Sequence, residues 1–261
     1  MARKLTIITR TCGRVFAIHG SRYIDKSKPE IINVCLSSLI HSINQVKDHD
    51  IELFVLDDNS NPECLADIKQ IVDQCKFPSH VVSCEGTGIT GASQTCSVVY
   101  KWVEEYCTDL WLHIEDDYLC FPELINDMIE SVDQFEANTG CMIAINPHDD
   151  PHRYTRQIYD SILLFGPHRH YRTVRHSTYT CLASRAIYDK YRNYFQDSAE
   201  WILRKTEDET INQVWNQADV MMFSPIPSLA LHLGDETVRD PYIDVDRLWF
   251  NVPQLWKNNP L

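Results

Sequence analysis

Four short apolar runs alternate with helix-patterned segments over the first 117 residues, and this alternation constrains the fold more than any other feature. Three of the runs, at residues 5–9, 51–56 and 110–114, have the length and composition of buried strands, and Val81-Val82 marks a further strand. Segments with apolar residues at helical spacing lie between them, at about 29–46, from Pro62 onward and at about 92–106. Strands that alternate with helices predict a parallel sheet with right-handed crossovers. Such sheets bind ligands at the carboxyl ends of their strands.

The pattern after residue 117 is more mixed. We predict a helix near 122–136, strands at 141–145, 178–182 and 220–223, a helix capped by Ser184 and a short helix at 207–216. No internal repeat or low-complexity linker divides the chain. We therefore expect one α/β domain over residues 1–261.

Composition argues against several classes of protein. Acidic residues outnumber basic ones by 37 to 24, and the net charge of −13 disfavours general binding to nucleic acids or anionic membranes. No apolar run approaches the roughly 20 residues of a membrane helix, and the first run is too short for a signal-peptide core. The 10 cysteines include no C-x-x-C pair, so we expect reduced thiols. These features favour a cytoplasmic globular protein without a membrane span.

An acidic triplet, Glu115-Asp116-Asp117, follows a strand that is apolar except for His113. Side chains at positions i and i+2 leave a strand end on the same side, so Glu115 and Asp117 can converge on one Mg²⁺ or Mn²⁺ ion. Such a cation would let an acidic protein hold a diphosphate, and it would stabilise a departing nucleoside diphosphate. The alternative is an acidic turn that only caps the next helix.

Two weaker signals lie at neighbouring strand ends. Asp57 and Asp58 close the strand at 51–56, where the alternative is a turn and helix cap before Pro62. Gly88 and Gly91 precede a helix in the manner of a phosphate-cradling loop, although two glycines at such a place also simply make a tight turn.

Taken together, these strand ends resemble the nucleotide-sugar half of a family 2 glycosyltransferase with the GT-A fold. The resemblance implies a Rossmann-like, mostly parallel central sheet flanked by helices, with a donor-binding half at about 1–117 and a mixed acceptor and catalytic half at about 118–261. It implies contacts to the nucleotide sugar by Thr9, Arg10, Asp57, Asp58, Gly88, Glu115 and Asp116. It also implies that Glu115 and Asp117 are the ends of a D-x-D motif, with Asp117 on the metal.

Thr206-Glu207-Asp208 matches the T-E-D tripeptide that processive family 2 enzymes use at the acceptor site. The match implies Asp208 as the catalytic base, which takes the proton of the acceptor hydroxyl during in-line displacement at the anomeric carbon. The alternative is a helix start, with Thr206 as the cap. His232 falls where many GT-A enzymes supply a further metal ligand, although a histidine in an apolar run is more often a core residue.

Two family motifs are missing. Ala92-Ser93-Gln94 stands where family 2 enzymes usually have Ala-Arg-Asn, and no Q-x-x-R-W motif follows Asp208. We therefore expect a metal-dependent, inverting transfer of single sugars from a nucleoside diphosphate sugar, with UDP favoured, to a hydroxyl of an acceptor such as a glycan. The alternatives are a sugar-1-phosphate nucleotidyltransferase and a non-catalytic sugar-binding domain of the same fold. The net charge counts against glycosylation of modified nucleobases.

The segment 151–176 concentrates basic residues in an otherwise acidic chain. It contains Arg153, Arg156, Arg169, Arg172 and Arg175 together with four histidines, against the single acidic residue Asp160. One interpretation is a site for an anionic acceptor or a cover for the diphosphate. The other is a solvated loop whose basic residues pair with acidic neighbours. The histidines do not have the spacing of a known structural zinc site.

Overall fold

The computed structural model describes residues 2–14, 24, 26–155, 160–177, 179–200, 205–234, 243–249 and 252. The first half forms β1 (Lys4–Thr11), α1 (Lys28–Asn44), β2 (Asp50–Asp57), α2 (Pro62–Val72), β3 (Ser79–Ser83), α3 (Gly91–Tyr106) and β4 (Leu110–Glu115). The second half begins with β5 (Tyr118–Cys120), α4 (Leu124–Thr139), β6 (Met142–Ile145), α5 (His152–Thr155), β7 (Leu163–Phe165) and β8 (His170–Val174). It continues with β9 (Cys181–Ser184), α6 (Arg185–Ala199), the 3-10 turn η2 (Glu207–Glu209), α7 (Ile211–Trp215), β10 (Val220–Ile226) and β11 (Ala230–His232).

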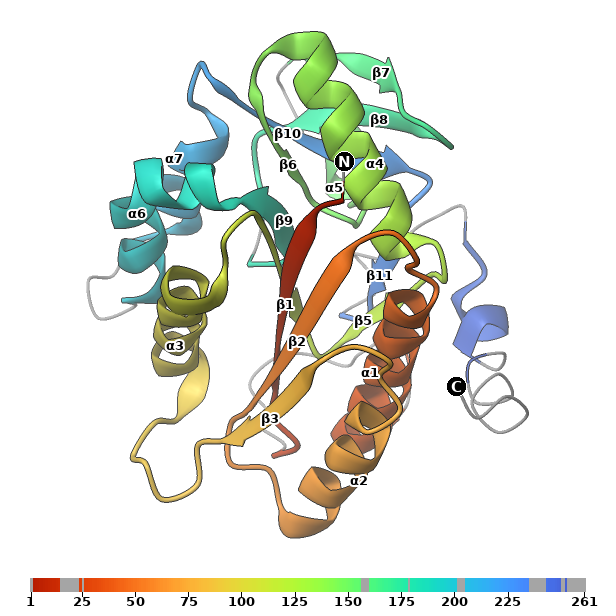
Figure 1. The fold of residues 1–261 in the computed structure, drawn as a ribbon, viewed down its shortest axis with the longest axis vertical. Helices are drawn as coiled ribbons and strands as arrows, with labels where there is room; N and C mark the ends of the chain where they lie inside the picture. Colours follow the sequence, from red (N-terminus) through yellow and green to blue (C-terminus); the bar gives the residue numbers. More distant parts are fainter. Residues whose placement is uncertain are drawn as a thin grey trace.

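One nine-stranded sheet runs through the molecule in the order β3-β2-β1-β4-β9-β6-β10-β8-β7 (Figure 1). Only β9 and β8 run against the other strands of this sheet, so it is mostly parallel. The predicted α/β class is therefore confirmed. β2 and β3 lie on one side of β1, whereas β4 lies on the other. Open α/β sheets bind their ligands at such a reversal of strand order, outside the carboxyl ends of the strands.

Helices cover both faces of the large sheet (Figure 1). On one face, α1, α2 and α4 pack against Ile7 of β1 and Leu112 of β4. On the other face, α3, α6 and α7 pack against Ile8 and Trp111 from the same two strands. Because these strands are buried on both sides, their sequences are continuously apolar rather than alternating. Every helix within the described ranges is too short or too polar to cross a lipid bilayer.

Two predicted helix starts are confirmed by their caps. At α1, the Ser27 side chain accepts a hydrogen bond from the backbone N–H of Glu30, and the Glu30 carboxylate accepts one from the backbone N–H of Ser27 at 2.9 Å. Pro29 is tolerated in this first turn because the N–H that it lacks would have no partner within the helix. At α6, the Ser184 side chain caps the helix by accepting from the backbone N–H of Ile187.

The second half differs more from the prediction. The strand predicted at 178–182 is observed as β9, and the helix predicted at 207–216 is divided at Thr210 into η2 and α7. The sequence analysis did not predict β5, β7, β8 or β11. Three of these strands contain only three residues, which is too short to show a period of two. β5 and β11 pair with each other in a separate antiparallel sheet.

Candidate functional site

Arg10 and Glu115 meet where the strand order reverses. They are register partners in the pairing of β1 with β4, and Arg10 Nη2 donates to Glu115 Oε1 at 2.9 Å. Arg10 Nη1 donates to the backbone carbonyl of Ala92 at 3.1 Å and to Thr95 Oγ1 at 3.2 Å, both in the first turns of α3. Burial raises the pKa of Glu115, although the charge of Arg10 opposes the shift. Arg10 thus connects the two strand ends to the start of α3.

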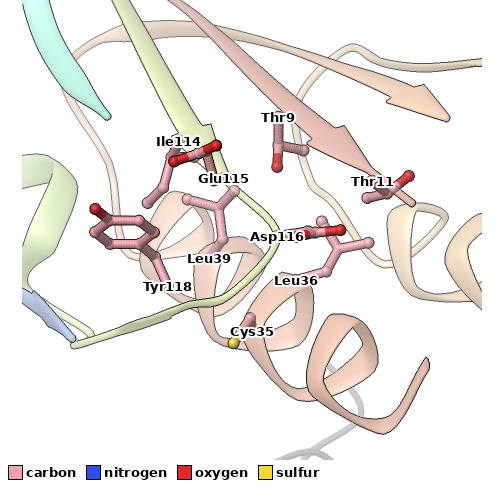
Figure 2. A pocket seen from close by; sticks show the side chains of 9 residues that line it. All are labelled: Thr9, Thr11, Cys35, Leu36, Leu39, Ile114, Glu115, Asp116 and Tyr118. Carbon is pink, nitrogen blue, oxygen red and sulfur yellow. The ribbon is translucent and has the colours of Figure 1, made fainter. Parts of the chain in front are cut away.

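Asp116 faces α1 rather than Arg10. Its Oδ2 accepts the backbone N–H of Cys12 at 2.9 Å, and its Oδ1 pairs with the ammonium of Lys28 in the first turn of α1. Figure 2 shows Asp116 beside a cavity of about 10 Å³, which Thr9 and the apolar side of α1 also line. This volume is at the lower limit for one water molecule. A nucleotide would therefore have to bind outside this cavity.

The small sheet brings His232 to Asp117. His232 lies opposite Tyr118 in the β5–β11 pairing, and the two rings stack at 4.9 Å between centroids and 20° between planes. The backbone N–H of Leu233 donates to the carbonyl of Asp117 at 2.8 Å. These contacts place His232 Nε2 3.6 Å from Asp117 Oδ1. The structure therefore brings together two of the three metal ligands that we expect.

The third expected ligand, Glu115, is held by Arg10. Within the described ranges, no group of three or more His, Cys, Asp or Glu side chains is placed to hold a metal ion. Asp117 and His232 nevertheless fit a cation that arrives with a diphosphate, because Mg²⁺ takes few protein ligands and fills its remaining positions with phosphate oxygens and water. The oxygen and imidazole donors also suit Mn²⁺.

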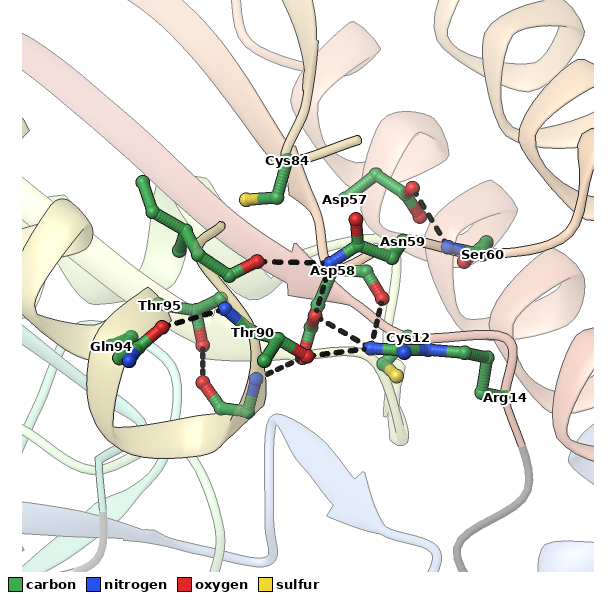
Figure 3. Close-up of polar contacts among 12 residues, drawn as sticks. Cys12, Arg14, Asp57, Asp58, Asn59, Ser60, Cys84, Thr90, Gln94 and Thr95 are labelled. Carbon is green, nitrogen blue, oxygen red and sulfur yellow. Dashed lines mark hydrogen bonds and ion pairs between the residues drawn. The ribbon is translucent and has the colours of Figure 1, made fainter. Parts of the chain in front are cut away.

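Asp58 joins the loops that follow β1, β2 and β3 (Figure 3). Its Oδ2 accepts the backbone N–H of Gly91 at 2.8 Å, and its Oδ1 accepts from Arg14 Nη2 at 2.8 Å and from Asn59 Nδ2 at 2.9 Å. Arg14 Nη2 also donates to Thr90 Oγ1 at 2.9 Å. The sequence analysis missed Arg14, because its importance depends on contacts with distant parts of the chain.

Three other residues that we expect to contact the nucleotide sugar, Asp57, Thr9 and Gly88, differ in their exposure. Asp57 is fully buried, and its carboxylate accepts from the Thr11 hydroxyl at 3.1 Å and from the backbone N–H of Ser60 at 3.0 Å. Thr9 is buried as well. Gly88 lies in an exposed turn with φ +80°, a conformation that favours glycine. The buried side chains of Asp57 and Thr9 thus support the ends of their strands and are not exposed to a ligand, whereas Gly88 is accessible to one.

Asp208, the expected base, lies on η2 with 70% of its side chain exposed. Its Oδ1 accepts from Asn212 Nδ2 at 2.9 Å and pairs with His176 Nδ1 at 3.0 Å. Asn212 contributes most to lowering the pKa of Asp208. Among the residues that the structure describes, no donor is bonded to Asp208 Oδ2. One oxygen of this carboxylate is thus anchored while the other is open.

Glu207 connects η2 electrostatically to the acidic triplet. Partial desolvation raises its pKa, and the negative charges of Glu115 and Asp208 add to the shift. Thr206 also caps η2, since its side chain accepts from the backbone N–H of Glu209. The capping interpretation therefore applies to this turn, and the negative charge of Glu115 contributes to the pKa of Glu207.

The basic segment 151–176 pairs largely with acidic neighbours. Arg172 Nη2 donates to the buried Asp149 at 2.6 Å, and Arg169 Nε donates to the buried Asp127 at 2.7 Å. For these two arginines the structure favours internal pairing over a site for an anionic acceptor. Arg156 lies outside the described residues.

Comparisons with known proteins support the fold. No protein-family model matches the sequence, and no curated protein matches it. S. aureus TarS 1–349 in complex with UDP is 15% identical, with a TM-score of 0.52, over 85% of this chain and 60% of that chain. Another S. aureus TarS structure is 14% identical, with a TM-score of 0.52, over 99% of this chain and 40% of that chain.

A putative glucose-1-phosphate thymidylyltransferase from Bacillus anthracis is 10% identical, with a TM-score of 0.51, over 96% of this chain and 95% of that chain. The present chain thus spans about 60% of TarS 1–349 and about 40% of the longer TarS chain. The strand order and these structural likenesses show that the chain has a Rossmann-like GT-A fold.

Proposed function

We propose that the protein is a metal-dependent, inverting glycosyltransferase that moves a sugar from a nucleoside diphosphate sugar to a hydroxyl group. The observation that carries the proposal is the pair Asp117 and His232, 3.6 Å apart beside the reversal of strand order. The acidic turn η2 supports it, since its Asp208 carboxylate is exposed and is anchored through one oxygen. UDP is the favoured nucleotide, because TarS structures of this fold hold UDP and UDP-GlcNAc.

The donor would bind across the carboxyl ends of β1, β2 and β4. Asp117 and His232 would hold the divalent cation, which when bound neutralises negative charge on the diphosphate. Asp58 fixes the start of α3 through the backbone N–H of Gly91. The positive end of this helix then faces the strand ends and favours an anion there. Arg10 keeps Glu115 in place beside this region.

Asp208 would act as the base on the acceptor. Its Oδ2 takes the proton as the acceptor oxygen forms a bond to the anomeric carbon, and the bond from that carbon to the diphosphate oxygen breaks in the same displacement. Its lowered pKa keeps the carboxylate ionised at neutral pH. His176 and Asn212 are positioning residues, because they hold the other oxygen. A single displacement inverts the anomeric configuration.

A thermal-shift screen of nucleoside diphosphate sugars, with and without Mn²⁺, tests the donor and the metal together. We expect a rise in melting temperature for a UDP-sugar that depends on Mn²⁺, because a ligand that binds only the folded state stabilises it. The anomeric configuration of the product, read by NMR, tests the displacement. Stabilisation without any metal dependence would contradict the metal site, and a retained configuration would contradict the single base.

A nucleotidyltransferase is the second candidate. It is favoured by the near full-length match in both chains to the Bacillus anthracis protein, at 96% and 95% coverage. The run Thr9-Arg10-Thr11-Cys12-Gly13 counts against it, because it is too short to match the glycine-rich, basic loop that such an enzyme needs after its first strand. The products distinguish the two reactions: a glycosyltransferase releases a nucleoside diphosphate, whereas a nucleotidyltransferase joins a sugar 1-phosphate to a nucleoside triphosphate and releases pyrophosphate.

A further inference from the structure

Lys28 occupies an unusual position for a lysine. It is the first residue of α1, where the helix dipole disfavours a positive charge. Its side chain is only 16% exposed, and lysines this buried are usually paired. The groups that face the Lys28 ammonium must therefore compensate for its burial and for the helix dipole.

The ammonium of Lys28 faces the acidic triplet. It pairs with Asp116 Oδ1, and it lies 3.9 Å from Asp117 Oδ2. The other oxygen of Asp117 lies 3.6 Å from His232 Nε2. Asp117 is thus bordered by Lys28 on one side and by the expected metal-binding histidine on the other.

This arrangement brings Lys28 within reach of a diphosphate. A cation held by a carboxylate places its other oxygen ligands within about 4 Å of that carboxylate. The Lys28 ammonium lies at a similar distance, 3.9 Å, from the same group. Lysine carries three N–H donors, and the bond to Asp116 uses one of them. Asp116 in addition retains the N–H of Cys12 at 2.9 Å.

We propose that Lys28 is a donor-binding residue that contacts the diphosphate, an inference that rests on the proposed function. In the absence of donor, Lys28 offsets the negative charge of Asp116 and Asp117. With donor bound, it adds a second positive charge beside the metal, on the group that leaves with the nucleotide. Lys28 thereby supplies a cation from α1, in addition to Arg10, which is paired with Glu115.

Isothermal titration calorimetry in Mg²⁺ tests the proposal with three probes: UDP, inorganic pyrophosphate and uridine. For Lys28→Gln we expect the affinities for UDP and pyrophosphate to fall by roughly 10- to 100-fold, the range of a hydrogen bond to a charged group. The affinity for uridine, which has no phosphate, should not change. Lys26→Gln is the matched control, because Lys26 is 40% exposed and lies 3.9 Å from Glu30 instead of the acidic triplet.

A second variant separates a loss of ligand affinity from a loss of folding stability. Lys28→Gln leaves the partly buried Asp116 without its charged partner, whereas Lys28→Gln/Asp116→Asn removes both charges together. We expect the double variant to show the same selective loss. Unchanged UDP affinity in both variants, or an equal loss for uridine, would overturn the role of Lys28. A wild-type protein that binds neither UDP nor pyrophosphate would overturn the proposed function as well.

Discussion

His113 should make the stability of the protein depend on pH. Its imidazole is fully buried in β4, and neither ring nitrogen makes a hydrogen bond within the described part of the chain. Burial lowers the pKa of His113 to about 3, and the nearby charge of Arg10 adds to the shift, whereas the backbone of Tyr179 opposes it. An unfolded histidine has a pKa of about 6.5. Between these two values the unfolded chain holds a proton on this residue that the folded chain does not.

The sign and size of the effect follow from proton linkage. Stability rises with pH wherever the unfolded state binds more protons, so it falls as the pH is lowered from 6.5 toward 3. Integrated from pH 7 to pH 5, one such histidine removes about 2 kcal/mol from the free energy of unfolding. His148, whose pKa burial also lowers to about 3, changes stability in the same direction.

Urea unfolding of the wild type and of His113→Leu at pH 7 and pH 5 measures this contribution. Leucine takes no proton, so the variant should lose about 2 kcal/mol less than the wild type between the two pH values. It should remain folded at pH 7, because the substitution removes two buried nitrogens that lack partners. His80→Leu, at a side chain 47% exposed, is the control. Equal pH dependence in the wild type and His113→Leu would refute a neutral, buried imidazole.

Four further results are expected. Asp208→Asn should lower turnover by roughly 10²- to 10⁴-fold while calorimetry shows unchanged UDP affinity; full activity would exclude it as the base. Asp117→Asn should abolish the Mn²⁺ dependence of UDP binding in the same assay, and retained dependence would place the metal elsewhere. Ser27→Ala should cost about 1 kcal/mol in urea unfolding, since it removes the α1 cap, and no loss would contradict the capping box. Gly91→Ala should cost roughly 1–2 kcal/mol because Gly91 has φ +81°, and an unchanged melting temperature would contradict that strain.

The parallel part of the sheet could be predicted because its strands are buried on both faces. Trp111 and Leu112 point to opposite faces of β4 and are both fully buried, so the run is apolar except for His113 and easy to recognise. The ends of such runs are marked by polar residues, which located Glu115 and Asp57 at strand ends. The three-residue strands β5 and β11 offered no such signal, although they bring His232 to Asp117.

The partners of the site residues could not be predicted from sequence. Lys28 and Asp116 are 88 positions apart, and Arg14 and Asp58 are 44 positions apart. Local patterns contain no information on pairs at such separations. The arginines of the basic segment were equally ambiguous, because Arg169 finds Asp127 only after β8 and α4 have packed. The strand pattern predicted the positions of the carboxylates, but it did not predict which lysine or arginine side chains pair with them.

β9 joins the two halves of the molecule through its hydrogen bonds. It pairs with β4 of the first half along one edge and with β6 of the second half along the other, in both cases antiparallel. A cut after residue 117 would strip β4 of this neighbour and leave an open edge, which invites aggregation. A redesign of this scaffold should therefore exchange loops and leave the shared strands intact.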